Sequence, residues 1–167
     1  MAVILYEDIL REFQRQKVRY IIVGGIAVNL LGLFRNTADL DILVEMTDVN
    51  LAKVVTILKK KGYRVKQPVD PMGIADKKTR NDWIKNKHMK AFNFYKEEEL
   101  KEVDIIIETP VPYANARKNV KRISGGGLTL PVVSLKDLIR MKKNTGRDID
   151  KMDIEQLKTV QRLRGRG

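Results

Sequence analysis

Two stretches of the sequence decide the fold: YIIVGGIAVN at residues 20–29 and RNTADLDI at residues 35–42. The first starts as an apolar, β-branched strand, reaches Gly24 and Gly25, and continues as an apolar segment that predicts a buried helix over residues 26–33. Glycine lets a backbone approach a ligand closely, and the free N–H groups at the start of a helix favour phosphate. The sequence therefore predicts an anion-binding turn between a strand and a helix.

The second stretch carries a pair of acids, Asp39 and Asp41, at the start of a strand predicted over residues 40–44. Residues two apart in a strand project from the same face, so these carboxylates are expected side by side. Adjacent carboxylates repel each other, which is tolerable at a solvated strand end and favourable around a divalent cation. Ligation by oxygen alone, completed by substrate phosphates, fits Mg²⁺ (or Mn²⁺) better than zinc.

A third acid, Asp104, lies near the start of an apolar strand predicted over residues 102–108. An unpaired charge there would cost several kcal/mol. One explanation is pairing with a nearby basic side chain. The other is a two-metal site shared with Asp39 and Asp41, with the ions about 3.5–4 Å apart. One ion would neutralise the pyrophosphate leaving group. The other would lower the pKa of an acceptor hydroxyl, with Asp104 as its ligand and candidate base.

The rest of the chain alternates between helical and extended patterns. Helices are predicted over residues 6–17, 48–61, 112–118, 134–143 and 148–163, and strands over residues 63–66, 91–95, 102–108 and 128–133. Residues 67–90 hold two prolines and many charges, and are predicted as a long loop with a helical turn around Trp83. The pattern predicts a mixed α/β (α+β) fold, a small mixed β-sheet flanked by helices, in a single domain over residues 1–167. The helices from about residue 134 form a candidate sub-lobe.

The net charge of +12, from 33 basic and 21 acidic residues, predicts a field that attracts polyanions. A lysine-rich surface of the kind found in thermophilic proteins explains the same number equally well. No apolar run reaches the roughly 20 residues of a membrane-spanning helix, and the start of the chain lacks a signal-peptide pattern. Without cysteine there is neither a disulfide framework nor a thiolate metal site. These absences favour a cytoplasmic protein without a membrane partner.

The glycine pair, the Asp39-x-Asp41 pair and the later Asp104 resemble the signature of the DNA polymerase β-like nucleotidyltransferase superfamily. Residues 20–42 resemble more narrowly the AbiEii-like and minimal nucleotidyltransferases of prokaryotes, which are often toxins, or partners, in toxin–antitoxin systems. The resemblance implies a nucleotidyltransferase fold, in which the glycine pair lines the triphosphate and the three aspartates bind metal. Many superfamily members carry Ser where this chain has Gly25, so a hydroxyl contact to phosphate is absent here.

Three further residues are candidates for nucleotide binding. Arg35 and Thr37 match an Arg-x-Thr that precedes the first acid in that branch. Arg35 is expected to bind a phosphate through its planar fork and Thr37 to brace the metal loop, unless they are only a surface base and a capping hydroxyl. Lys142 lies on a half-apolar helix, from which it would reach the triphosphate. Its alternative role is that of a solvated charge favoured by the helix dipole.

These features predict a metal-dependent nucleotidyltransferase that moves a nucleoside monophosphate from an NTP to a hydroxyl group of an acceptor. An RNA acceptor such as a tRNA end fits the charge, and a protein side chain, for example on an antitoxin partner, fits the small size. The alternative is a non-catalytic nucleotide- or RNA-binding module of the same fold, although such a module has no need of three carboxylates opposing a polyanion. A third interpretation, a structural half of a toxin–antitoxin complex, predicts a tight protein partner and no effect of NTP.

Overall fold

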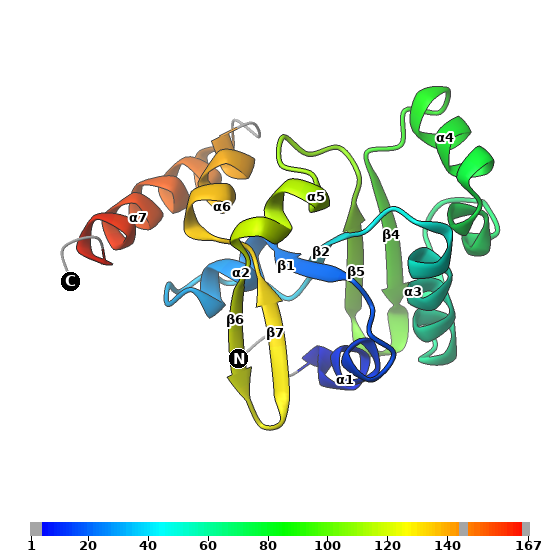
Figure 1. Cartoon of the computed structure of the whole chain (residues 1–167), viewed down its shortest axis with the longest axis horizontal. Helices are drawn as coiled ribbons and strands as arrows, with labels where there is room; N and C mark the ends of the chain where they lie inside the picture. The colour runs from blue at the N-terminus through cyan, green and yellow to red at the C-terminus, as the bar shows by residue number, and fades with distance from the viewer. Residues whose placement is uncertain (1–4, 144–146, 165–167) are drawn as a thin grey trace.

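The computed structural model describes residues 5–143 and 147–164, and within them seven strands form one mixed sheet (Figure 1). The strands are β1 (Tyr20–Val23), β2 (Leu40–Val44), β3 (Arg64–Val65), β4 (Ala91–Lys96), β5 (Lys101–Ile106), β6 (Lys121–Gly125) and β7 (Leu128–Val132). Their spatial order is β3-β4-β5-β2-β1-β7-β6. The β2–β5 and β1–β7 pairs are parallel and the other neighbours are antiparallel. This arrangement confirms the predicted mixed α/β fold.

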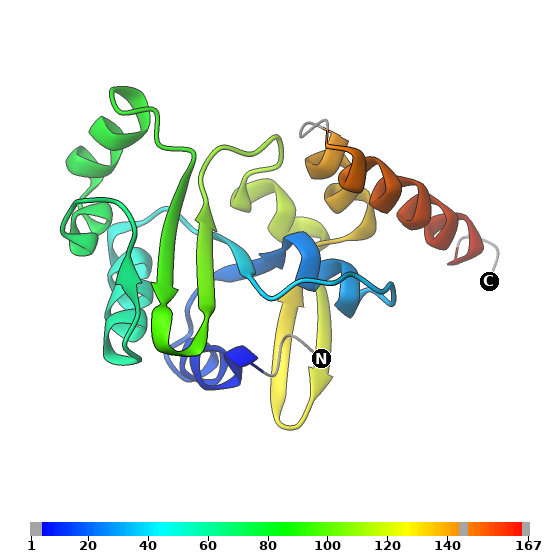
Figure 2. The same cartoon turned by 180° about the vertical axis from the view of Figure 1, so that it is seen from behind.

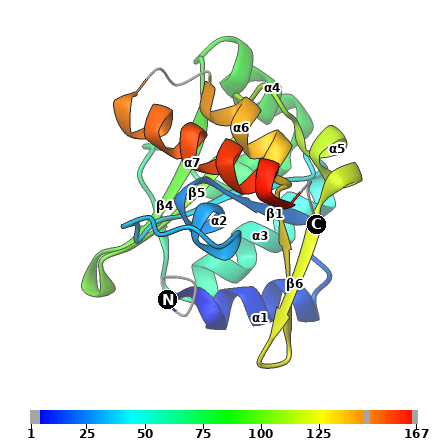
Figure 3. The same cartoon turned by 90° about the vertical axis from the view of Figure 1, so that its left-hand side faces the viewer.

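Helices lie around this sheet and at both ends of the molecule. They are α1 (Glu7–Arg15), α2 (Gly24–Leu30), α3 (Asp48–Lys60), α4 (Lys77–Lys85), α5 (Tyr113–Ala116), α6 (Leu135–Lys143) and α7 (Asp148–Arg164), with short 3-10 helices η2 (Pro71–Ala75), η3 (Glu97–Glu99) and η4 (Arg117–Asn119). Figure 1 shows α6 and α7 at one end and α3 and α4 at the other. The view from behind in Figure 2 shows the β6–β7 hairpin extending away from the rest of the molecule. In Figure 3, seen from the α6–α7 end, both helices lie in front of the sheet.

Strands β4 and β5 bury one face and leave the other partly open. Phe92 and Phe94 of β4 are fully buried, as are Val103 and Ile105 of β5. The intervening residues are half-buried and include Asp104. Because side chains alternate along a strand, the apolar set turns into the core and the polar set shares the opposite face. That polar face carries the acidic residues of the candidate site.

The start of the sheet is held by α1 and by the cap of α3. Phe13 of α1 is fully buried and meets the ring of Tyr20 edge-on, at a centroid distance of 5.0 Å. The hydroxyl of Thr47 accepts a hydrogen bond from the backbone N–H of Asn50 at 3.3 Å, which caps α3 directly after β2. Both contacts fix β1 and β2, the two strands that carry the glycine turn and the first acids.

The segment 67–90 differs most from its prediction, because it contains η2 and α4 instead of a long loop. The carboxylate of Asp76 caps α4 by accepting from the N–H of Thr79 at 2.9 Å. Trp83 packs against Phe92 at a centroid distance of 5.7 Å. Arg80 is buried and donates to the backbone oxygen of Ile74 at 2.7 Å. A short helix that rests on one tryptophan and one buried arginine has little apolar periodicity, so the pattern did not reveal it.

Two other differences concern strands. The edge strand β6 was not predicted, because its residues are mostly exposed and lack an apolar alternation. The strand predicted over residues 102–108 ends at Ile106, where the backbone N–H groups of Ile107 and Glu108 both donate to the oxygen of Lys90 at 2.9 Å. The predicted helix 26–33 is α2, which starts earlier, at Gly24. Across the two described ranges, the helices are all too short or too polar to cross a bilayer.

Candidate active site

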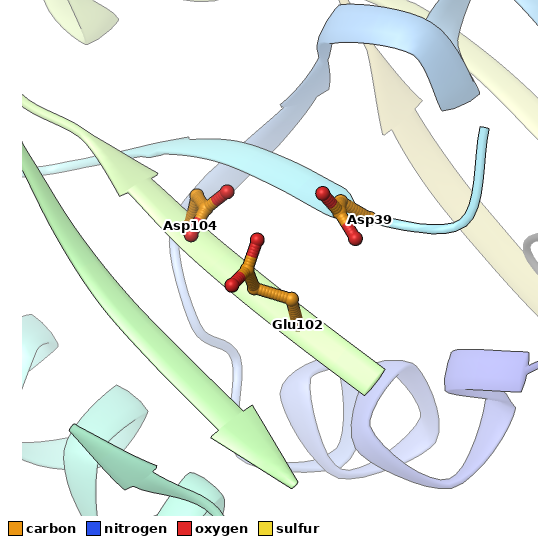
Figure 4. Close-up of side chains that lie close together, drawn as sticks. All are labelled: Asp39, Glu102 and Asp104. Carbon is orange, nitrogen blue, oxygen red and sulfur yellow. The ribbon is translucent and has the colours of Figure 1, made fainter. Parts of the chain in front are cut away.

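Three carboxylates gather on the polar face of β2 and β5. They belong to Asp39, which directly precedes β2, and to Glu102 and Asp104 of β5, and one oxygen of each lies within 4.8 Å of the others. Figure 4 shows the three side chains turned toward one another above the sheet. Oxygen-only donor sets of this kind suit a hard divalent cation such as Mg²⁺ or Mn²⁺. The residues present therefore fit the metal that the sequence predicts.

The fourth acid, Asp41, lies beside this cluster. Parallel pairing of β2 with β5 places Asp41 next to Asp104. Burial, together with the negative charges of Asp104 and Asp39, raises the pKa of Asp41 to about 7, and Lys142 opposes the shift. Burial also raises the pKa of Asp104, against the hydrogen bond that Asn93 donates to it. The carboxyl groups are thus crowded and short of positive charge, as expected of a site that receives a cation.

Sequence reasoning predicted Asp39, Asp41 and Asp104 as the acidic trio, and the structure brings all three together. It missed Glu102, which joins the cluster and pairs with Lys66. The signal was available, because Glu102 precedes Asp104 by two positions and therefore shares its face of the strand. The same rule had already paired Asp39 with Asp41.

The glycine pair sits where site side chains approach the backbone. Gly24 has a φ of +70°, and a Cβ atom there would lie 2.2 Å from Oδ2 of Asp41. A Cβ atom at Gly25 would lie 2.7 Å from the hydroxyl oxygen of Thr37. Both distances are far inside van der Waals contact, so any larger residue would displace the acid or the threonine. The turn predicted from Gly24 and Gly25 thus adjoins Asp41, and Thr37 packs directly on it.

The two predicted cationic residues converge on one acid of α7. The Nζ atom of Lys142 lies 3.2 Å from Asp150 and 3.0 Å from Asp153, and only 8% of its side chain is exposed. The Nε atom of Arg35 lies 3.5 Å from Asp153. The interpretation of Lys142 as a solvated helix-end charge is therefore wrong, because α7 covers it with two carboxylates. Arg147, at the start of α7, pairs with Asp150 at 2.5 Å.

A cavity of about 170 Å³ is lined both by Asp41 and by residues of the α6–α7 end of the molecule. Its lining includes Gly24, Asp41, Lys142 and Arg147. Pro110, which follows β5, also lines it. Asp41, one glycine of the turn and two basic side chains thus share one cavity, and the cluster of three carboxylates lies beside Asp41.

The site combines a glycine turn, carboxylates on neighbouring parallel strands and flanking helices. This combination is typical of a nucleotidyltransferase. The family model described as aminoglycoside-2''-adenylyltransferase matches residues 6–159, so the chain belongs to this family. The match supports the superfamily that the sequence resembles, but not the narrower AbiEii-like branch. No curated protein sequence matches the chain.

Solved structures share the fold at low sequence identity. A lincosamide antibiotic adenylyltransferase, LnuA, in a lincomycin-bound crystal structure, has a TM-score of 0.62 and 20% identity, with 93% of this chain and 96% of that one covered. The enzyme ANT(2")-Ia, in complex with adenylyl-2"-tobramycin, has a TM-score of 0.57 and 16% identity over 98% of this chain and 94% of that one. An antigenic nucleotidyltransferase-like protein from Paracoccidioides brasiliensis gives 0.55 and 15%, over 97% and 75% respectively. These likenesses confirm the nucleotidyltransferase fold.

Proposed function

We propose that this chain transfers the adenylyl group of ATP to a hydroxyl group of an antibiotic-like acceptor. A bond forms between the acceptor oxygen and the α-phosphorus, the bond from that phosphorus to the β-phosphate bridge breaks, and pyrophosphate leaves. The family match over residues 6–159, whose description is that of an adenylyltransferase, carries the proposal. The acceptor class rests on the neighbours, one bound to lincomycin and another to adenylylated tobramycin.

We assign the metal-binding role to the carboxylates of Asp39, Asp41, Glu102 and Asp104. A bound Mg²⁺ or Mn²⁺ would neutralise phosphate charge and lower the pKa of the acceptor hydroxyl. The crowding of Asp41 and Asp104, each with a raised pKa, supports this assignment because a cation would relieve their repulsion. Asp104 is the proposed acceptor of the hydroxyl proton.

The nucleotide is proposed to bind between the glycine turn and the α6–α7 end. The absence of side chains at Gly24 and Gly25 lets the backbone of the turn lie directly against Asp41 and Thr37, so the triphosphate would bind to the turn through backbone N–H groups close to the metal-binding acids. Arg35 and Lys142 are proposed to contact phosphate oxygens, in competition with Asp153, which contacts both side chains. A triphosphate carries more negative charge than one carboxylate, and its oxygens accept two parallel hydrogen bonds from an arginine guanidinium.

A nucleic-acid acceptor is the second candidate, and the net charge of +12 is the observation that favours it. Neither the family match nor the fold supports an antitoxin or other protein acceptor. The family match also favours the enzyme over the non-catalytic binding module.

The test uses purified protein with each of the four NTPs carrying ³²P at the α-position, Mg²⁺ or Mn²⁺, and three separate acceptors. These acceptors are an aminoglycoside, a lincosamide and total RNA. We expect label from ATP on one of the antibiotics, and none with the Asp39→Asn/Asp41→Asn double variant. Label on RNA alone would establish the second candidate instead. Equal labelling by the double variant would contradict the roles assigned to the acids.

A further inference from the structure

A chain of side-chain hydrogen bonds leads from the edge of the sheet to the acidic cluster. Gln67 follows β3, and its Nε2 atom donates to Oδ1 of Asn93 at 2.8 Å. Asn93 lies on β4 directly opposite Asp104, and its Nδ2 atom donates to Oδ1 of that carboxylate at 2.7 Å. Two amides therefore connect the outer strands of the sheet with the third acid.

The backbone determines which side-chain group donates and which accepts in this series of hydrogen bonds. The Oε1 atom of Gln67 accepts from the backbone N–H of Asn93 at 3.2 Å, while its Nε2 atom donates to the backbone oxygen of Ala91 at 3.2 Å. A flipped amide would set NH₂ against N–H and oxygen against oxygen, so only one orientation satisfies both groups. The Gln67 NH₂ group then faces Oδ1 of Asn93, which leaves the Asn93 NH₂ group to donate to Asp104. The polarity of the sheet backbone is thus transmitted through two amides to one carboxylate oxygen.

Holding one oxygen of Asp104 in this way has a consequence for the other. A carboxylate that is free to rotate about its last torsion samples many orientations, since that torsion is broad. The hydrogen bond from Asn93 to Oδ1 restricts this torsion in Asp104 and leaves the second oxygen available to the acidic cluster. Partners behind a metal ligand commonly act in this way, and their loss costs about 10–100-fold in metal affinity or activity.

We propose that Gln67 and Asn93 are positioning residues that orient Asp104 for its role in the acidic cluster. The proposal rests on the proposed function, in which Asp104 binds metal and accepts the hydroxyl proton. A purely structural role is the competing explanation, since the Gln67 side chain also extends the β3–β4 ladder, where the N–H of Lys66 donates to the oxygen of Asn93 at 2.8 Å.

The substitution Gln67→Glu separates the two explanations. It keeps the size of the side chain and reverses the donor-to-acceptor direction of the hydrogen bonds from position 67 to Asp104. The introduced carboxylate still accepts from the backbone N–H of Asn93, but it no longer offers a donor to the Asn93 side chain. The Asn93 amide then turns its NH₂ group toward position 67 and its oxygen toward Asp104. Gln67→Met removes the hydrogen bonds without imposing the wrong orientation. We therefore expect Gln67→Glu to lower Mn²⁺ affinity more than Gln67→Met does, whereas a ladder-extending role predicts that both variants lose stability and keep their Mn²⁺ affinity.

The measurements are Mn²⁺ affinity by isothermal titration calorimetry, and kcat and KM for ATP in the transfer assay, all on the full chain. For Gln67→Glu and Asn93→Leu we expect Mn²⁺ affinity and kcat to fall about tenfold or more, with KM for ATP nearly unchanged. Arg64→Gln is the matched control, because it changes the net charge by the same amount on the exposed side chain of a neighbouring position. In the Asn93→Leu background, adding Gln67→Glu should cause little further loss of Mn²⁺ affinity, because the hydrogen bonds between position 67 and Asp104 are already interrupted.

Melting temperatures identify any variant that fails to fold, and Gln67→Met then provides the comparison. The proposal is overturned if folded Gln67→Glu and Asn93→Leu bind Mn²⁺ as tightly as the wild type, or if Arg64→Gln loses as much affinity as Gln67→Glu. Loss of Mn²⁺ affinity in a protein whose wild type transfers nothing to any acceptor would support the positioning role and refute the proposed function.

Discussion

Two charged regions of this molecule differ in their electrostatics: one gathers charges of the same sign, and the other pairs charges of opposite sign. On β2 and β5, carboxylates of like charge crowd together, and the pKa of Asp41 rises to about 7. Between α6 and α7, by contrast, Lys142 is enclosed by Asp150 and Asp153, so opposite charges neutralise each other inside the chain. The acids of the first region would be neutralised by a bound cation, whereas those of the second are neutralised by basic side chains such as Lys142. The comparison separates a site built for a ligand from a network that also holds two helices together.

The largest effect is expected at the like-charged region. Asp104→Asn should lower adenylyl transfer about 10³-fold or more, because removing a metal contact forfeits several kcal/mol of transition-state stabilisation at about 1.4 kcal/mol for each tenfold. Glu102→Gln should lower it less, since Lys66 already neutralises part of that charge. Steady-state kcat/KM at saturating Mg²⁺ measures both. Glu98→Gln, at an exposed acid of η3 just before the same strand, is the control. A larger loss for Glu102→Gln than for Asp104→Asn would reverse the assigned order.

The pH dependence of the metal-free protein sharpens the same contrast. The pKa of Asp41 is near 3.8 when unfolded and about 7 when folded, so the folded state holds its proton more tightly. The contribution of Asp41 to stability is therefore fully present below the unfolded pKa and is lost as the pH rises toward 7, by about 1.4 kcal/mol for each unit of pKa difference. Urea titrations in EDTA between pH 4 and pH 8 measure this slope. Asp41→Asn should flatten it, and an unchanged slope in that variant would assign the effect to another group.

The charge-neutral region is expected to respond through stability. Lys142→Met leaves Asp150 and Asp153 buried with less positive charge, and breaking a buried pair on one side costs about 3–5 kcal/mol. Arg35 and Arg147 still face these acids, so the lower end of that range is expected. Urea unfolding measures the change. Lys143→Met, at the exposed neighbouring position, should change the free energy of unfolding by less than about 0.5 kcal/mol. Equal losses in both variants would refute the buried network as the cause.

The smallest effect is expected at the glycine turn that joins the two regions. Gly25→Ala places a methyl group 2.7 Å from the hydroxyl oxygen of Thr37, and overpacking of this kind costs about 1–3 kcal/mol. Thr37→Gly removes all three of the closest side-chain atoms, so the double variant should recover most of that loss. A double-mutant cycle from urea unfolding measures the coupling. Strictly additive losses would mean that the two side chains do not meet.

What the sequence revealed, and what it left hidden, follows the range of the interactions involved. The glycine turn and the Asp39–Asp41 pair are local patterns, readable from a strand that ends in glycine and from residues two apart. Glu102 obeys the same local rule, but its place in the cluster depends on the parallel pairing of β2 with β5. The burial of Lys142 depends on acids of α7, and no pattern within α6 indicates them. Likewise, the hydrogen bonds from Gln67 to Asp104 depend on the pairing of β3 with β4. Gln67 also begins the segment 67–90, whose helices carry little apolar periodicity.

The position of the label in ATP distinguishes nucleotidyl transfer by the acidic cluster from phosphoryl transfer. Wild-type protein is incubated with Mg²⁺, an aminoglycoside or a lincosamide, and ATP labelled with ³²P at either the α- or the γ-phosphate. We expect labelled acceptor from α-labelled ATP only, with the γ-label released in pyrophosphate. Acceptor labelled from γ-labelled ATP would show phosphoryl transfer instead and would refute nucleotidyl transfer, as would the absence of label from both.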